Sequence, residues 1–150
     1  MNRRGFTLIE VVIVLGLAGL VLLLVFYGVN QGNRFRRDND RQTAAGKVLT
    51  AAKAWVASNN GTLPGAADIP TILTSAQGGE AFTDPSGNAW QLSWHSGTPA
   101  LGATIYIQSQ ASCSAGSIVL NSTLGAGFTN TRQVAVAVML EDGQSYCVST

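Results

Sequence analysis

The sequence has few of the residues on which enzymes depend. Its 150 residues include a single histidine, His95, and two cysteines, and only 11% of its residues are charged. His95 stands next to Gly97 and Pro99 in a predicted turn, and it cannot form a catalytic pair with a cysteine if the two cysteines are bonded to each other. The sequence contains no phosphate-binding loop, zinc-ligand spacing or nucleophile elbow. It therefore predicts no enzymatic activity, no cofactor and no metal site.

The sequence also lacks an excess of charge of either sign. The formal net charge is +1 at neutral pH, and no internal repeat is visible. A nearly neutral chain suits dense packing against copies of itself, and it gives no general electrostatic case for binding nucleic acid. With 150 residues, there is room for one domain and one anchoring segment.

What the sequence has in abundance is one apolar run near its N-terminus, residues 6–29. Within this run the ionisable side chains are those of Glu10 and Tyr27. At about 1.5 Å per residue the run forms a helix of roughly 36 Å, which is enough to cross a hydrocarbon core of ~30 Å. A carboxylate inside lipid costs about 3 kcal/mol on insertion scales, so we expect Glu10 to have a partner.

The residues around the start of this run form a recognisable motif. A short basic leader, Met1-Asn2-Arg3-Arg4, precedes the stretch Gly5-Phe6-Thr7-Leu8-Ile9-Glu10. Together they resemble the class III signal of the type IV pilin family, which also includes the pseudopilins of type II secretion and the competence pilins. The resemblance implies cleavage between Gly5 and Phe6 by a prepilin peptidase, and N-methylation of Phe6. It also implies an assembly platform in the membrane and a cytoplasmic ATPase.

A physical role for Glu10 accompanies the resemblance. Cleavage after Gly5 would free an α-amine on Phe6 that is mostly charged at neutral pH. If helices pack side by side with an axial offset, Glu10 of one copy can meet the Phe6 amine of its neighbour. Such a pair is strong when complete and costly when half is missing, so it would favour one register over others. The alternative is a glutamate near the membrane edge that only reaches toward water.

Two further observations bear on the run. A secretory signal peptide has a core of about 7–15 residues and a small-x-small cleavage site, whereas this run is longer and the stretch Val25-Phe26-Tyr27-Gly28 has no such site. A count of Lys and Arg around the run favours an outward N-terminus, whereas the motif implies a cytoplasmic one. We give more weight to the motif.

An amphipathic pattern follows the apolar run. Phe35, Val48, Leu49, Ala52, Trp55 and Val56 fall mostly at helical spacing. We expect one helix over residues 6–59, ended by Asn59-Asn60-Gly61 with Gly61 as the left-handed cap. Pilins often carry a proline in the membrane-spanning half, but here none precedes Pro64. If the helix loosens in a filament, residues 28–32 with their two glycines are the candidate segment.

A basic cluster lies just beyond the apolar run. Its arginines are interspersed with two aspartates, and the members are Arg34, Arg36, Arg37, Asp38, Asp40 and Arg41. Three interpretations remain open: contact with lipid head groups, pairing with the aspartates of neighbouring copies, and a solvated helix face. Because no aromatic residues are interleaved in a way that favours DNA, we do not expect DNA binding.

The rest of the chain has the pattern of a β-rich domain. We expect a short helix over residues 69–75, a turn over residues 84–90 and a two-residue hairpin at Asp142-Gly143. The expected strands cover residues 90–94, 104–108, 117–120, 133–140 and 145–148. Cys147 then lies on the last strand and Cys113 in the loop before Ser117. In a domain outside the cytoplasm the two would form a disulfide, the alternative being two free buried thiols.

The expected fold class is α+β, with a long N-terminal helix packed on an antiparallel β-sheet head, as in type IV pilins. The expected divisions are the leader (1–5), the transmembrane and assembly helix (6–29), the amphipathic helix packed on the head (30–60) and the globular head (61–150). The resemblance implies a precursor in the inner, cytoplasmic membrane that assembles into an extracellular homopolymeric pilus serving adhesion and twitching motility. The alternatives are a pseudopilin or minor pilin and, in another class, a membrane-anchored binding module or enzyme.

Overall fold

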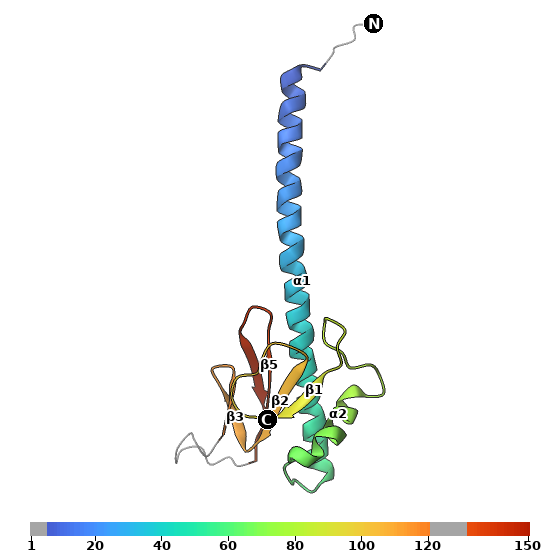
Figure 1. Ribbon diagram of the computed structural model, residues 1–150, viewed down its shortest axis with the longest axis vertical. Coiled ribbons are helices and arrows are strands. Elements are labelled where there is room, and N and C mark those ends of the chain that lie inside the picture. The colour runs from blue at the N-terminus through green and yellow to red at the C-terminus, as the bar shows by residue number, and fades with distance from the viewer. Residues whose placement is uncertain (1–5, 121–131) are drawn as a thin grey trace. The chain divides into compact units, whose positions relative to one another are not determined.

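The computed structural model describes residues 6–120 and 132–150. The chain divides into two compact units, Met1–Arg36 and Arg37–Thr150. Helix α1 (Leu8–Ser58) contributes to both and is labelled in Figure 1. The expected layout, one long apolar helix followed by a β-rich region, is confirmed. The leader, residues 1–5, lies outside the described residues.

In the first unit the apolar run is helical and uncovered. Apart from Asn30, every residue from Phe6 to Arg36 is exposed, and the Phe6 side chain is 87% exposed. No proline interrupts the helix, and Gly28 and Gly32 both lie within it. By length and composition α1 is able to cross a membrane.

In the second unit α1 presents a buried stripe that begins at Arg41. The stripe follows the i, i+3, i+4, i+7, i+8 pattern of one helix face and comprises Arg41, Ala44, Ala45, Val48, Leu49 and Ala52. Trp55 packs at the edge of this core. Phe35 was expected to extend the stripe, but it is 74% exposed and lies in the first unit.

Helix α1 ends in a left-handed turn. Asn60 has φ 54° and Gly61 has φ 79°, and the Gly61 N–H donates to the Val56 carbonyl at 2.9 Å. This six-to-one bond is that of a Schellman motif, in which Asn60 is the first left-handed residue. The expected end of the helix is therefore correct, but the cap begins one residue earlier than predicted.

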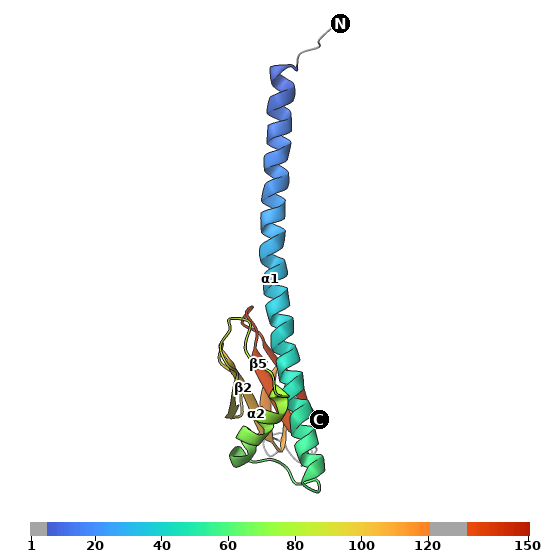
Figure 2. The same ribbon diagram turned by 90° about the vertical axis from the view of Figure 1, so that its right-hand side faces the viewer.

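The main sheet has four strands in the order β1-β2-β5-β6. Their bounds are β1 Gln91–Trp94, β2 Thr104–Ser109, β5 Val134–Met139 and β6 Ser145–Ser149. The β2–β5 and β5–β6 pairs are antiparallel, but β1 pairs with β2 in parallel, which corrects the expectation of a wholly antiparallel sheet. Figure 2 shows β2 and β5 lying beside the second-unit part of α1.

The two faces of the sheet are covered by different elements. Ile105, Ile107, Val136 and Val138 belong to the same core as the stripe on α1. On the other face Ala135 and Ala137 pack against Ala111 and Ile118 of a small hairpin. The alternation of valine and alanine in β5 therefore reflects two buried faces, with the smaller residues under the hairpin.

That hairpin consists of β3 (Ala111–Ser114) and β4 (Ser117–Leu120). Strand β4 was expected, but β3 was not, and Cys113 was assigned to a loop. The structure places Cys113 within β3, opposite Ile118 of β4. The turn between these strands uses Ala115 and Gly116, which both have positive φ.

The segment between α1 and the sheet carries a 3-10 turn, η1 (Ala66–Asp68), and α2 (Ile69–Gln77). The expected short helix is thus confirmed, and it continues to Gln77. Pro70 lies in its first turn, where a missing N–H costs nothing, and Gly78 ends it with φ 61°. The turn expected over residues 84–90 is also present, because Asp84 Oδ1 accepts the Asn88 N–H at 2.7 Å.

The turn between β5 and β6 differs from the prediction. The Leu140 N–H donates to the Gln144 carbonyl at 2.8 Å, so three residues rather than two form the loop. Gly143, the third of them, has φ 82°, as the glycine of a bulged three-residue hairpin loop requires.

Candidate functional site

The N-terminus of α1 is capped by hydrogen bonds between Thr7 and Glu10. The Thr7 backbone N–H and the Thr7 hydroxyl donate to the same carboxylate oxygen of Glu10, at 2.9 and 2.8 Å. In return the Glu10 N–H lies 3.4 Å from the Thr7 hydroxyl oxygen. This reciprocal arrangement is a capping box with Thr7 at the N-cap and Glu10 at the third helical position.

The capping box was not predicted, although the sequence contains its signature. The pattern Thr7-x-x-Glu10 directly before an apolar run is typical of a helix N-terminus. Glu10 thus acts as a hydrogen-bond acceptor at the helix start, in addition to carrying a charge. The structure therefore gives Glu10 a partner within its own chain.

The surface that follows this cap is apolar and uncovered. Its large side chains, from Phe6 and Leu8 to Phe26 and Val29, are between about half and nine-tenths exposed. Gly5, the predicted processing residue, lies outside the described residues, and Phe6 beside it is described and exposed. The pairing of Glu10 with the Phe6 amine of a neighbouring copy stays a prediction.

The members of the basic cluster fall into two groups: the engaged residues, whose side chains have a hydrogen bond or ion pair within the described residues, and the unengaged residues, whose side chains have none there. Arg37 Nε lies 2.7 Å from a carboxylate oxygen of Glu141, and Asp38 Oδ1 accepts the Glu141 N–H at 2.7 Å. Arg41 is only 3% exposed, donates to the Gly102 carbonyl at 3.0 Å and lies over the Trp90 ring at 5.8 Å. These three residues fix α1 to loops of the second unit.

The remaining charged members of the cluster face solvent. Arg34, Arg36 and Asp40 are exposed. Within the described residues no hydrogen bond or ion pair engages their side chains. They are therefore available for a partner outside the chain.

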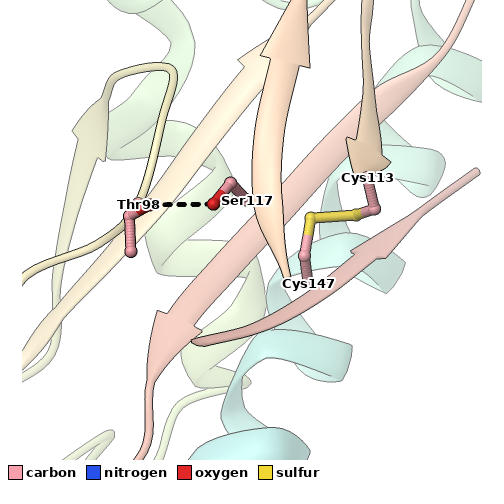
Figure 3. Close-up of a disulfide and its surroundings, with 4 residues drawn as sticks. All are labelled: Thr98, Cys113, Ser117 and Cys147. Carbon is pink, nitrogen blue, oxygen red and sulfur yellow. Dashed lines mark hydrogen bonds between the residues drawn. A yellow bond between two sulfur atoms is a disulfide. The ribbon is translucent and has the colours of Figure 1, made fainter. Parts of the chain in front are cut away.

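The predicted disulfide is present. Cys113 of β3 and Cys147 of β6 are bonded, with their Cα atoms 5.6 Å apart. Figure 3 shows that the bond joins the small hairpin to the last strand of the main sheet, while the hydroxyls of Thr98 and Ser117 lie 2.8 Å apart on the hairpin's other side. The hairpin is thus held on both sides.

The described residues offer little for catalysis. Among residues 6–120 and 132–150 there is no group of three or more His, Cys, Asp or Glu residues that could hold a metal ion. His95 packs edge-on against Tyr106, with ring centroids 4.9 Å apart. A depression of about 800 Å³ lies between α1 and α2 and is lined mainly by small side chains such as Gly46, Ala51 and Ala54.

Comparison with known proteins identifies only the N-terminal part of the chain. Residues 1–26 match the family model described as the prokaryotic N-terminal methylation motif. No curated protein and no solved structure matches the chain. The matched region contains the capping box and most of the uncovered apolar surface.

Proposed function

We propose that this chain, which carries the class III signal of the type IV pilin and pseudopilin family, is a structural subunit of a type IV pilus filament. It would be cut between Gly5 and Phe6, held in the cytoplasmic membrane through residues 6–29, and then assembled into an extracellular homopolymer. The role is structural and not catalytic. A prepilin peptidase, an assembly platform and a cytoplasmic ATPase are the partners that the signal implies, and adhesion and twitching motility are the expected uses.

The observation that carries the proposal is the uncovered apolar surface of residues 6–29, most of which lies within the matched region. None of the apolar window of α1 is buried within the chain. Lipid covers such a surface in a precursor, and neighbouring helices can cover it in a filament. Burial against water would be worth about 25 cal/mol per Å². A helix that leaves lipid gains much less, because lipid tails are already apolar.

The free energy of apolar burial differs little between lipid and a filament of packed helices. Polar contacts would therefore decide the axial offset between neighbouring copies. In this proposal the Phe6 amine of one copy replaces Thr7 as the main partner of Glu10 in the next. The exchange replaces a neutral donor with a charged one, so the carboxylate gains the Coulombic attraction of an ion pair, which is strong where water is excluded. A complete pair would therefore favour assembly at one offset.

The alternatives differ in what they require. A pseudopilin or minor pilin would share the signal and the fold but would not be the main component of a surface filament. A membrane-anchored binding module or enzyme would have an activity in residues 61–150 alone and would not depend on Glu10.

The test is the N-terminal residue and mass of the protein in filaments sheared from cells. We expect this chain to dominate the sheared fraction and to begin with N-methylated Phe6. Gly5→Val should leave an unprocessed precursor in the membrane fraction, whereas Asn2→Ser, in the same leader, should be processed normally. An intact leader in assembled material, or a mature-size band from Gly5→Val, would overturn the proposal.

A further inference from the structure

Arg36 and Asp40 are the two unengaged members of the basic cluster that carry opposite charges and lie four residues apart. We propose that Arg36 of one copy binds Asp40 of the adjacent copy in the assembled filament. The inference rests on the proposed function, since it needs copies packed side by side. It names the second copy, rather than a lipid surface, as the partner of these exposed charges.

The axial offset supports this contact. Glu10 follows Phe6 by four residues, and Asp40 follows Arg36 by four. A parallel copy displaced by four residues, about 6 Å, brings its Phe6 level with Glu10 and its Arg36 level with Asp40. One axial offset therefore brings both oppositely charged pairs level. Because thirty residues separate Glu10 from Asp40, their positions around a helix of 3.6 residues per turn differ by about 120°, and the two pairs would be made with different neighbours.

The other charged residues of the cluster do not compete for this contact. Arg34 and Asp38 are also four residues apart, but Asp38 is partly buried and its Oδ1 accepts the Glu141 N–H, which fixes its carboxylate against the second unit, whereas Asp40 is exposed. Arg37 and Arg41 would oppose like charges at the same offset, but Arg37 is paired with Glu141 and Arg41 is buried. The structure thus neutralises or hides the charges that would oppose this register.

The surroundings of Asp40 suit a guanidinium. Asp40 lies on the wall of a cavity of about 320 Å³ that is also lined by Asp84, Trp90 and Lys47. Asp84 is only 5% exposed, and its Oδ1 accepts the backbone N–H groups of Ser86 and Asn88, which fixes its position. Two carboxylates and one lysine line the cavity, which favours a cation there. Trp90 is 3% exposed and its ring is already covered by Arg41, so the carboxylates and not the ring would attract the guanidinium.

A charge-reversal experiment in cells tests the contact between copies. Arg36→Asp and Asp40→Arg should each lower the yield of sheared filaments on the order of tenfold, because like charges would then meet. Cells that express both variants together should recover most of the yield, since each contact between alternating copies then joins an aspartate of one variant to an arginine of the other. Each variant alone carries like charges at both positions, so a pair within one chain cannot explain this recovery. The double variant R36D/D40R should also recover.

Controls separate this contact from other causes of failure. Each variant should keep the melting temperature and the disulfide of the wild-type chain, since both side chains are exposed. Arg34→Asp, at the nearby unengaged arginine, should lower the yield much less. Equal losses for Arg34→Asp and Arg36→Asp without recovery on co-expression would overturn the contact and indicate head-group binding instead. Normal filaments from both single variants would overturn it too, whereas a wild-type chain that forms no filaments would overturn the proposed function itself.

Discussion

At the scale of single residues, Glu10 has two roles that can be separated by substitution. In the described chain it accepts two hydrogen bonds from Thr7, and in the proposed filament it supplies a negative charge. Glutamine can occupy the third position of a capping box but carries no charge. Glu10→Gln should therefore be processed and membrane-bound, with an intact first helical turn, but it should yield at least on the order of tenfold fewer filaments. Immunoblots of sheared and membrane fractions measure this ratio.

Thr7→Val is the matched comparison, because it removes the capping hydroxyl and keeps the carboxylate. Loss of an N-cap side chain costs about 1 kcal/mol, so amide exchange in the first turn should accelerate roughly fivefold in detergent micelles. Its filament yield should exceed that of Glu10→Gln. Normal filaments from Glu10→Gln would contradict the charge pairing, and unchanged exchange in Thr7→Val would contradict the cap.

The disulfide makes a second prediction at this scale. Cys113 and Cys147 are 34 residues apart, and closing a loop of that length contributes about 3–4 kcal/mol in the chain-entropy model. Cys147→Ser should lower the free energy of unfolding of the second unit by about that amount, as measured by urea denaturation. A reducing agent should lower the wild-type value to that of the variant and leave the variant unchanged. Equal stability of the two proteins without reductant would contradict a stabilising bond.

At the scale of elements, the sequence predicts what local patterns determine. The long helix follows from an apolar run, a helical periodicity and the absence of proline, and its ends carry recognisable caps. The strand β3 was missed because Ala-Ser-Cys-Ser has little strand propensity, and its conformation depends on pairing with β4. The parallel pairing of β1 with β2 was missed because parallel neighbours usually need a longer crossover than residues 95–103 provide.

The candidate site was predictable to a similar extent. The motif at residues 5–10 and the two cysteines were identified from the sequence, whereas the Thr7-x-x-Glu10 capping pattern was present in the sequence but was not predicted. The sequence could not predict which arginines of the basic cluster have partners within the chain. Glu141 and Gly102 lie far from Arg37 and Arg41 in the sequence and contact them only in the folded chain.

The attachment of the β5–β6 turn to α1 gives a prediction at the scale of elements. Asp38 accepts a backbone N–H of the turn, whereas Arg37 forms an ion pair whose side chains are 42% and 20% exposed. Partly exposed ion pairs contribute at most about 1 kcal/mol, and loss of an acceptor from a shielded N–H costs about 1–3 kcal/mol. Asp38→Ala should therefore destabilise the second unit more than Arg37→Gln in urea denaturation. Asp38→Asn keeps an acceptor oxygen and should lie between wild type and Asp38→Ala, and the reverse order of Asp38→Ala and Arg37→Gln would contradict this account.

At the scale of the whole molecule, the two units differ in how their apolar side chains are covered. Among the described residues the buried side chains begin at Arg41, so the second unit contains the entire described core, and it also contains the disulfide. The first unit contributes exposed apolar side chains and needs lipid or other helices around it. The buried core and the surface proposed for assembly are thus carried by different parts of one chain.

This separation predicts that a chain beginning at Arg37 folds on its own. Its helix, residues 37–58, should remain helical because the buried stripe packs on the sheet, although an isolated helix of this length is only marginally stable in water. We expect a soluble monomer with a cooperative urea transition, and a free energy of unfolding within about 1 kcal/mol of that of the full chain's second unit in detergent. Circular dichroism and analytical ultracentrifugation measure these properties, and Val48→Asp in the same shortened chain should abolish the cooperative transition by placing a charge in the core. A shortened chain that aggregates or unfolds without cooperativity would show that residues 6–36 contribute to the fold, and the assembly surface could then not be altered independently of it.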